Sequence, residues 1–87
     1  MKKKMNKEKI KLTRYNFGEI VLISEGMKYY SSEWISKNGL LPGAGLYFRE
    51  KTKGQFVKVS PDSGPLYHII LVNKELFEIF HKDLQKV

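Results

Sequence analysis

Two segments of the chain carry the dense runs of aliphatic and β-branched residues that are typical of strands. Residues 19–24 read Glu-Ile-Val-Leu-Ile-Ser, approached by Tyr-Asn-Phe-Gly at 15–18, and residues 66–72 read Leu-Tyr-His-Ile-Ile-Leu-Val. Such residues fit the pleated, half-buried surface of a sheet. The pattern predicts two strands. The first is broken by Glu25-Gly26, and the second is apolar enough to be central in its sheet.

Two shorter strands are predicted on either side of a connection that ends in glycine. Residues 46–50 and 55–59 carry the apolar and aromatic side chains, and Lys51-Thr-Lys-Gly54 lies between them. A four-residue connection of this kind is typical of a hairpin with a type I turn followed by glycine at positive φ. We therefore expect these strands to pair with each other. Residues 60–65, Ser-Pro-Asp-Ser-Gly-Pro, are expected to form a loop.

The stretch from residue 27 to residue 45 is expected to be a long excursion with one short helix. Ser31 or Ser32 can cap a helix over residues 33–37, and Gly39 suits the position just after its end. Glu33 in the first turn and Lys37 in the last complement the helix dipole. Leu40-Leu-Pro-Gly43 then predicts a turn.

The last fourteen residues allow two interpretations. Residues 74–86 place their apolar side chains on one face of a helical wheel, and Glu78 and Lys82 form a favourable i,i+4 pair, which predicts an amphipathic helix and an α+β fold. Alternatively, residues 73–75 form a turn, 76–80 a strand, and 81–84 a single 3₁₀ turn that leads into a last short strand. Periodicity favours the helix, whereas the order of the elements favours the strand.

Charge divides the chain into an arm and a body. Residues 1–11 contain six lysines and one acid, which gives +5 of the total formal charge of +7. The other residues carry ten basic and eight acidic groups. We therefore predict a flexible basic arm over residues 1–11 and a single small β domain over residues 12–87. A lysine arm is attracted to any polyanion without reading its sequence.

Composition excludes several classes of protein. The 87 residues include no cysteine, which excludes disulfides and thiol chemistry and favours an intracellular protein. The longest aliphatic runs, residues 20–23 and 69–72, are far shorter than the ~20 residues of a membrane span. The charged start lacks the apolar segment of a signal peptide. We expect a cytoplasmic protein without membrane contact.

Two short sequence segments resemble parts of a known group of folds. Gly-Glu-Ile-Val-Leu-Ile at residues 18–23 resembles the opening strand, and Phe-His-Lys-Asp-Leu-Gln-Lys-Val at residues 80–87 the closing segment, of SH3-like small barrels in bacterial and phage accessory proteins. The resemblance covers residues 15–87. It implies a mainly β, partly open barrel with a short helix in the long first loop. Such barrels serve as binding modules, so it also implies binding rather than chemistry.

The sequence offers little material for catalysis. Its two histidines are His68, which is expected to be a satisfied, half-buried strand residue, and His81, in a charged stretch. Together with Asp83 they match no known metal-ligand spacing. The glycine-rich residues 39–45 lack the lysine and hydroxyl residue of a phosphate loop. We predict a protein that is not an enzyme, without metal or other cofactor.

Binding is the remaining role, and two kinds of partner fit the sequence. Between residues 28 and 58, six basic and two acidic residues give a local charge of +4, interleaved with aromatic rings that could stack on bases. This predicts DNA or RNA binding with weak sequence preference. The expected contacts are Lys2, Lys3, Lys4, Lys28, Tyr29, Tyr30, Trp34, Lys37, Arg49, Lys51, Lys53 and Lys58.

The alternative partner is a protein. A small domain with exposed aromatic residues and a strand edge suits an adaptor, or an inhibitor of a host or cognate protein such as a nucleic-acid enzyme, encoded by a phage or another mobile element. Trp34 is open to two interpretations: a lid over one end of the barrel, or a stacking platform for a base.

Overall fold

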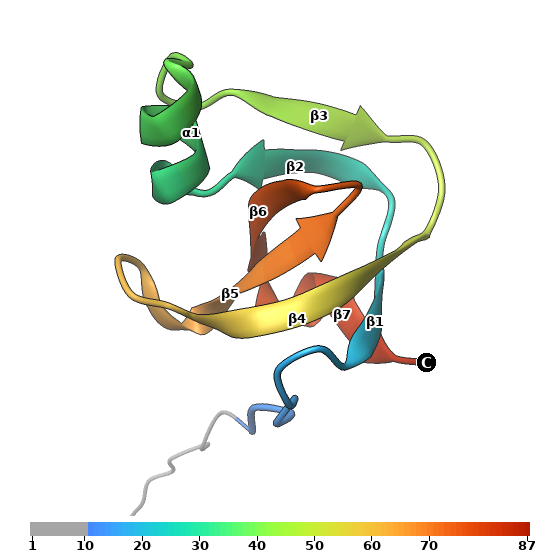
Figure 1. Ribbon diagram of the computed structural model, residues 1–87. Helices are drawn as coiled ribbons and strands as arrows, with labels where there is room; N and C mark the ends of the chain where they lie inside the picture. Colours follow the sequence, from blue (N-terminus) through green and yellow to red (C-terminus); the bar gives the residue numbers. More distant parts are fainter. Residues whose placement is uncertain (1–10) are drawn as a thin grey trace, which may run out of the picture.

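The computed structural model describes residues 11–87, which form one antiparallel sheet and one helix (Figure 1). The strand order is β3-β2-β6-β5-β4-β1-β7, and the sheet is strongly bent but does not close into a barrel. The mainly β prediction is therefore confirmed for this part of the chain. Except for Lys11, the predicted arm lies outside the described residues. The elements in chain order are β1 (Ile20–Ile23), β2 (Gly26–Tyr30), α1 (Ser32–Asn38), β3 (Gly45–Phe48), β4 (Thr52–Ser60), β5 (Gly64–Val72), β6 (Glu75–Phe80), the 3₁₀ turn η1 (His81–Asp83) and β7 (Leu84–Lys86).

The predicted hairpin between residues 46–50 and 55–59 is wrong, although both strands exist. β3 pairs with β2, whereas β4 pairs with β1 on one side and β5 on the other. The chain thus bends once between β1 and β2 and again between β3 and β4. After both bends, β3–β4 runs antiparallel alongside β1–β2, so that β2 pairs with β3 and β1 pairs with β4 (Figure 1). Residues 49–51 make the second bend instead of folding β4 back onto β3.

Gly54 does not end a turn; it lies within β4, opposite Val21 of β1. It is not among the glycines with positive φ. A Cβ atom at this position would lie 2.7 Å from Ile70 Cγ2 and 2.9 Å from Val72 Cγ2. Glycine is therefore required here because β5 packs closely against β4, not because of turn geometry.

The core fills the inside of the bend. Its buried side chains come from every strand except β2: Val21, Ile23, Phe48, Phe56, Ile70, Val72, Phe77, Ile79 and Leu84. Phe77 is fully buried at its centre, with the Tyr30 ring stacked on it at 4.7 Å and the Phe48 ring edge-on at 5.2 Å. These aromatic contacts give a small domain a large buried area from few residues.

The predicted C-terminal helix over residues 74–86 is wrong, and the strand interpretation is confirmed. Asn73 and Lys74 both have positive φ, +49° and +69°, as a two-residue hairpin turn requires. Phe77 and Ile79 point into the core with the period of a strand. Leu76 and Phe80 instead pair with Leu71 and Tyr67 on the other face. Because both faces of β6 carry apolar residues, the sequence pattern of residues 74–86 also fits the apolar face of an amphipathic helix.

The short helix forms where the sequence predicts it. The Ser31 side chain accepts a hydrogen bond of 3.1 Å from the Trp34 backbone N–H, and Gly39 takes the left-handed conformation after the last turn, with φ +65°. With only seven residues, α1 is stabilised by these caps and by its contact with β6. No helix within residues 11–87 is long and apolar enough to cross a membrane.

Candidate binding surface

Lys28 is buried, contrary to its predicted place on an exposed cationic face. Its side chain is only 6% exposed, and its ammonium group lies 3.9 Å from Asp83 Oδ2 and donates a hydrogen bond to the Glu25 carbonyl at 3.2 Å. Asp83 also accepts a hydrogen bond from the Ser24 hydroxyl. Lys28 therefore holds the corner between β1 and β2 against η1, which removes it from the set of residues that could meet a partner.

The outward face of β2 and β3 carries three exposed side chains that we call the β2–β3 surface: Met27, Tyr29 and Tyr47. Their exposed fractions are 42%, 51% and 67%. Met27 and Tyr29 alternate with the inward-pointing Lys28, and Tyr47 lies directly opposite Met27. The residue opposite Tyr29 is Gly45. Because glycine has no side chain, nothing from β3 covers the Tyr29 ring there.

This surface adjoins an open edge of the sheet. Within residues 11–87, β3 has a neighbour on one side only. Its sequence, Gly-Leu-Tyr-Phe, contains none of the charges or prolines by which proteins usually block strand edges. Leu46 of this strand and Leu41 just before it are also exposed. The edge therefore offers unpaired backbone groups next to aromatic and aliphatic side chains.

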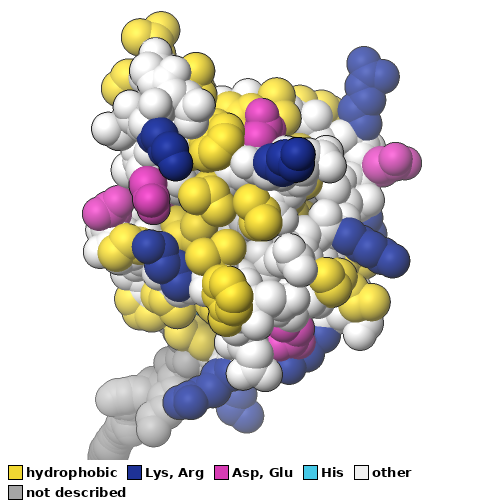
Figure 2. Space-filling model, in the orientation of Figure 1, with side chains coloured by type: hydrophobic (Ala, Val, Ile, Leu, Met, Phe, Trp, Pro, Cys, Tyr) yellow, Lys and Arg dark blue, Asp and Glu magenta, His cyan; other side chains and the backbone are white. Residues whose placement is uncertain are grey.

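The cations on one face of the molecule do not gather into one patch. On the face shown in Figure 2, lysine and arginine side chains lie at several separate places with acidic side chains among them, while apolar side chains gather near the middle. Lys58 forms an ion pair with Glu33 at 3.9 Å. Lys37, Arg49, Lys51 and Lys53 are exposed and form no ion pair with any residue that the structure describes. Arg49 and Lys51 follow β3 in the sequence, in the connection to β4.

Tyr30 and Trp34 belong largely to the edge of the core. The Tyr30 ring stacks on Phe77, its hydroxyl donates to Glu75, and burial raises its pKa above the ordinary value, with Glu75 adding to the effect. The Trp34 ring is half-buried, 6.3 Å from the Tyr30 ring. Trp34 thus extends the aromatic stack outward, which matches the lid interpretation better than an open stacking platform.

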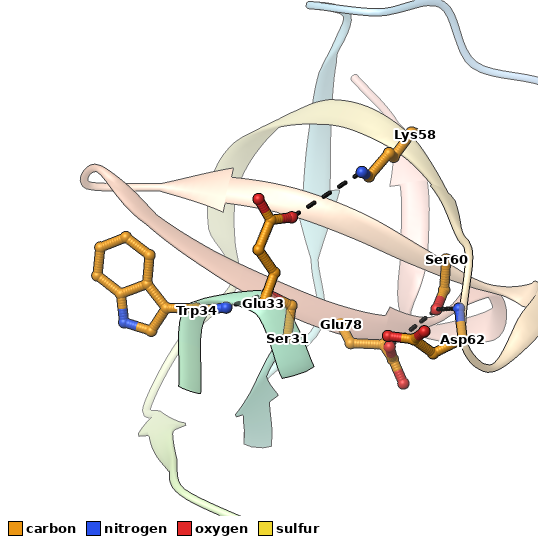
Figure 3. A network of polar contacts seen from close by, with 7 residues as sticks. All are labelled: Ser31, Glu33, Trp34, Lys58, Ser60, Asp62 and Glu78. Atoms are coloured by element: carbon orange, nitrogen blue, oxygen red, sulfur yellow. Dashed lines mark hydrogen bonds and ion pairs between the residues drawn. The ribbon is translucent and has the colours of Figure 1, made fainter. Parts of the chain in front are cut away.

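A polar network fixes α1 and the β4–β5 loop. Figure 3 shows Glu33 reaching from α1 toward Lys58 on β4, while the Trp34 ring points in another direction. Nearby, Glu78 of β6 accepts hydrogen bonds from the hydroxyls of Ser60 and Ser63, at 2.9 and 2.6 Å. The Ser60 hydroxyl in turn accepts from the backbone N–H groups of Asp62 and Ser63. Both carboxylate oxygens of Glu78 and the hydroxyls of Ser60 and Ser63 have partners, so this part of the network is a structural brace.

His68 is buried more deeply than predicted. It is 3% exposed, and its Nδ1 has no hydrogen-bond partner among the described residues, so it is not the satisfied, half-buried side chain that the sequence suggested. Its ring contacts Phe56 edge-on at 5.3 Å. Burial lowers the pKa of His68, a hydrogen bond with the Tyr67 backbone opposes this, and the nearby His81 lowers it further. The imidazole is therefore neutral at pH 7.

This lowered pKa predicts a pH-dependent stability. Between the pKa of His68 in the folded state and its higher value in the unfolded chain, the unfolded chain binds more protons, so stability falls as the pH falls. The protein should therefore lose more stability between about pH 7.5 and about pH 5.5 than His68→Leu does. Thermal melts of both proteins measure the difference. His81→Gln serves as the control for the second histidine, and equal pH slopes for wild type and His68→Leu would contradict the prediction.

Within residues 11–87, no group of three or more His, Cys, Asp or Glu side chains is arranged to hold a metal ion. His68, His81 and Asp83 are used separately: His68 in the core, His81 against the Phe80 ring, and Asp83 at the corner with Lys28.

No family model, curated protein or solved structure matches this chain.

Proposed function

We propose that this protein is a non-catalytic binding module that contacts nucleic acid with weak sequence preference. The observation that carries the proposal is the β2–β3 surface, where two exposed tyrosine rings share one face of the sheet, opposite a methionine and a glycine. Exposed rings on a sheet are platforms on which successive bases can stack. Arg49 and Lys51, next to this surface, are suited to phosphate contacts.

The charge of the whole chain supports the same proposal. The net charge is +7, and Lys2, Lys3 and Lys4 lie in its most basic segment. Such residues contribute affinity without sequence information. The bent antiparallel sheet with a helix in the first long connection is compatible with the SH3-like class of small binding domains, to which we assign it as part of this proposal. A cysteine-free chain suits a reducing compartment, so the proposed location is the cytoplasm.

Salt dependence tests the electrostatic part of this proposal. Fluorescence anisotropy with labelled single-stranded DNA, duplex DNA and RNA should show affinity falling steeply between about 50 and 200 mM salt. Replacing Lys2, Lys3 and Lys4 by glutamine should lower the slope of log K against log salt by about 3 on duplex DNA, if all three meet phosphates. A matched triple replacement of Lys74, Lys82 and Lys86 should change it much less. The absence of binding to any of these nucleic acids at low salt would overturn the proposal.

The open edge of β3 favours a second candidate, an adaptor or inhibitor that binds a host or cognate protein. An extended segment of the partner would add a strand beside β3, with Leu46 and Tyr47 as side-chain anchors. Such a contact depends less on salt than phosphate contacts do. A pull-down with and without nuclease separates the two candidates, because a protein partner held directly survives nuclease and a nucleic-acid bridge does not.

A further inference from the structure

A cavity lies between the start of the described chain and strands β4 and β5, away from β2 and β3 (Figure 1). The cavity has a volume of about 510 Å³. This falls within the range of small-molecule pockets, roughly 300–1,000 Å³. Residues 12–15 form one wall, and Phe56, Val59, Pro65 and His68 form the others.

The walls suit a flat ring. The Tyr15 and Phe56 rings are 5.6 Å apart and inclined by 31°, and the His68 ring stands nearly perpendicular to both, at 78° and 85°. Pro65 adds a further apolar surface. Such walls offer ring faces and ring edges to a planar guest, the arrangements that aromatic groups prefer.

The polar groups of the cavity are few, and one is unpaired. His68 lines the cavity, yet its Nδ1 is buried without a hydrogen-bond partner among residues 11–87. A buried polar atom in this state costs stability, and an apolar residue would avoid the cost. Arg14 and Thr13 lie at the same cavity. The site therefore combines apolar walls, the imidazole of His68 and a cationic group.

We propose that this cavity binds one planar nitrogen heterocycle of nucleobase size. The ring would lie against Tyr15 and Phe56, its hydrogen-bonding edge would meet the His68 imidazole, and Arg14 would contact an attached phosphate. The heterocycle can come from a free mononucleotide or from one unstacked base of a strand. The first source is independent of the function proposed above, and only the second rests on it.

The test is calorimetric titration of the full chain with AMP, GMP, CMP and UMP, together with NMR of the histidine side-chain nitrogens. At least one mononucleotide should bind saturably and shift the His68 resonances while leaving those of His81 unchanged. His68→Leu should weaken this binding about tenfold or more while raising the melting temperature. A variant that gains stability and loses binding identifies His68 as a ligand contact, because a purely structural residue would not show both.

Two further arms complete the design. Tyr15→Leu should also weaken binding, which keeps the test valid if His68→Leu does not fold, and His81→Gln should bind as the wild type does. An oligonucleotide with one abasic position should bind more weakly than the intact strand only if the cavity takes a base from a strand. Variants of Tyr29 and Tyr47 should leave mononucleotide binding unchanged, which separates this site from the β2–β3 surface. If no mononucleotide binds at millimolar concentration and the abasic strand binds like the intact one, the proposal is wrong.

Discussion

Replacing Tyr29 and Tyr47 together by alanine is expected to weaken binding to single-stranded nucleic acid about 30-fold or more. The reason is that each exposed ring can stack on one base, and each such contact is worth about 1–3 kcal/mol. Both rings lie on the same outward face, and neither packs in the core. Fluorescence anisotropy at low salt measures the loss, and the melting temperature should change little because the side chains are exposed.

The matched control keeps the rings and removes only the hydroxyls. The double variant Tyr29→Phe, Tyr47→Phe should bind nearly as tightly as the wild type, since stacking needs the π-face rather than the oxygen. If the alanine variant binds as tightly as the phenylalanine variant, bases do not stack on the β2–β3 surface, and the lysines alone would have to explain any affinity.

Gly54→Ala is expected to destabilise the fold by about 2–3 kcal/mol, although it adds a single methyl group to a strand. The new Cβ would meet Ile70 Cγ2 at 2.7 Å, Val72 Cγ2 at 2.9 Å and the Leu71 carbonyl oxygen at 3.0 Å. Two of these atoms belong to the core and one to the backbone of β5, so none can move away freely. Denaturant unfolding measures the change, which corresponds to a melting temperature lower by roughly 8–24 °C in a domain of this size.

Gln55→Ala is the control for this experiment. Gln55 neighbours Gly54 in β4 but is exposed, so its replacement should change the stability by less than about 0.5 kcal/mol. Wild-type stability in Gly54→Ala would mean that β4 and β5 do not approach as closely as described. It would also restore the hairpin interpretation, in which residue 54 ends a turn.

Local signals in the sequence correctly located most elements. The helix cap at Ser31 and Gly39 depends only on neighbouring residues, so it could be predicted without the rest of the fold. The strands that contain residues 20–23 and 66–72 were evident because their apolar runs match burial in the sheet. The sequence does not predict β2, because the usual pattern of buried apolar and exposed polar residues is reversed in this strand. Its buried position holds Lys28, whereas Met27 and Tyr29 on either side are exposed.

The candidate site was only partly predictable for the same reason. The neighbouring cations mark Tyr29 as a candidate contact, whereas no local signal marks Met27, because residues 26–30 lack the alternating pattern of a strand with a buried apolar face. The local charge of +4 between residues 28 and 58 predicts Lys28 as a surface contact, but the corner between β1 and β2 supplies its ammonium group with Asp83 and the Glu25 carbonyl. The cavity beside His68 could not be foreseen, since it joins residues 12–15 to strands more than forty positions later.

By itself, then, the sequence determined a small, mainly β chain with one capped helix and a concentration of lysines in its first eleven residues. These properties depend on composition and on contacts between near neighbours. The tertiary structure alone decided which strands pair, that Gly54 packs against β5, that Lys28 is buried and that two tyrosines share an open face. These outcomes depend on where the chain bends, and the corner between β1 and β2 is stabilised by residues far apart in the sequence, Ser24 and Lys28 with Asp83.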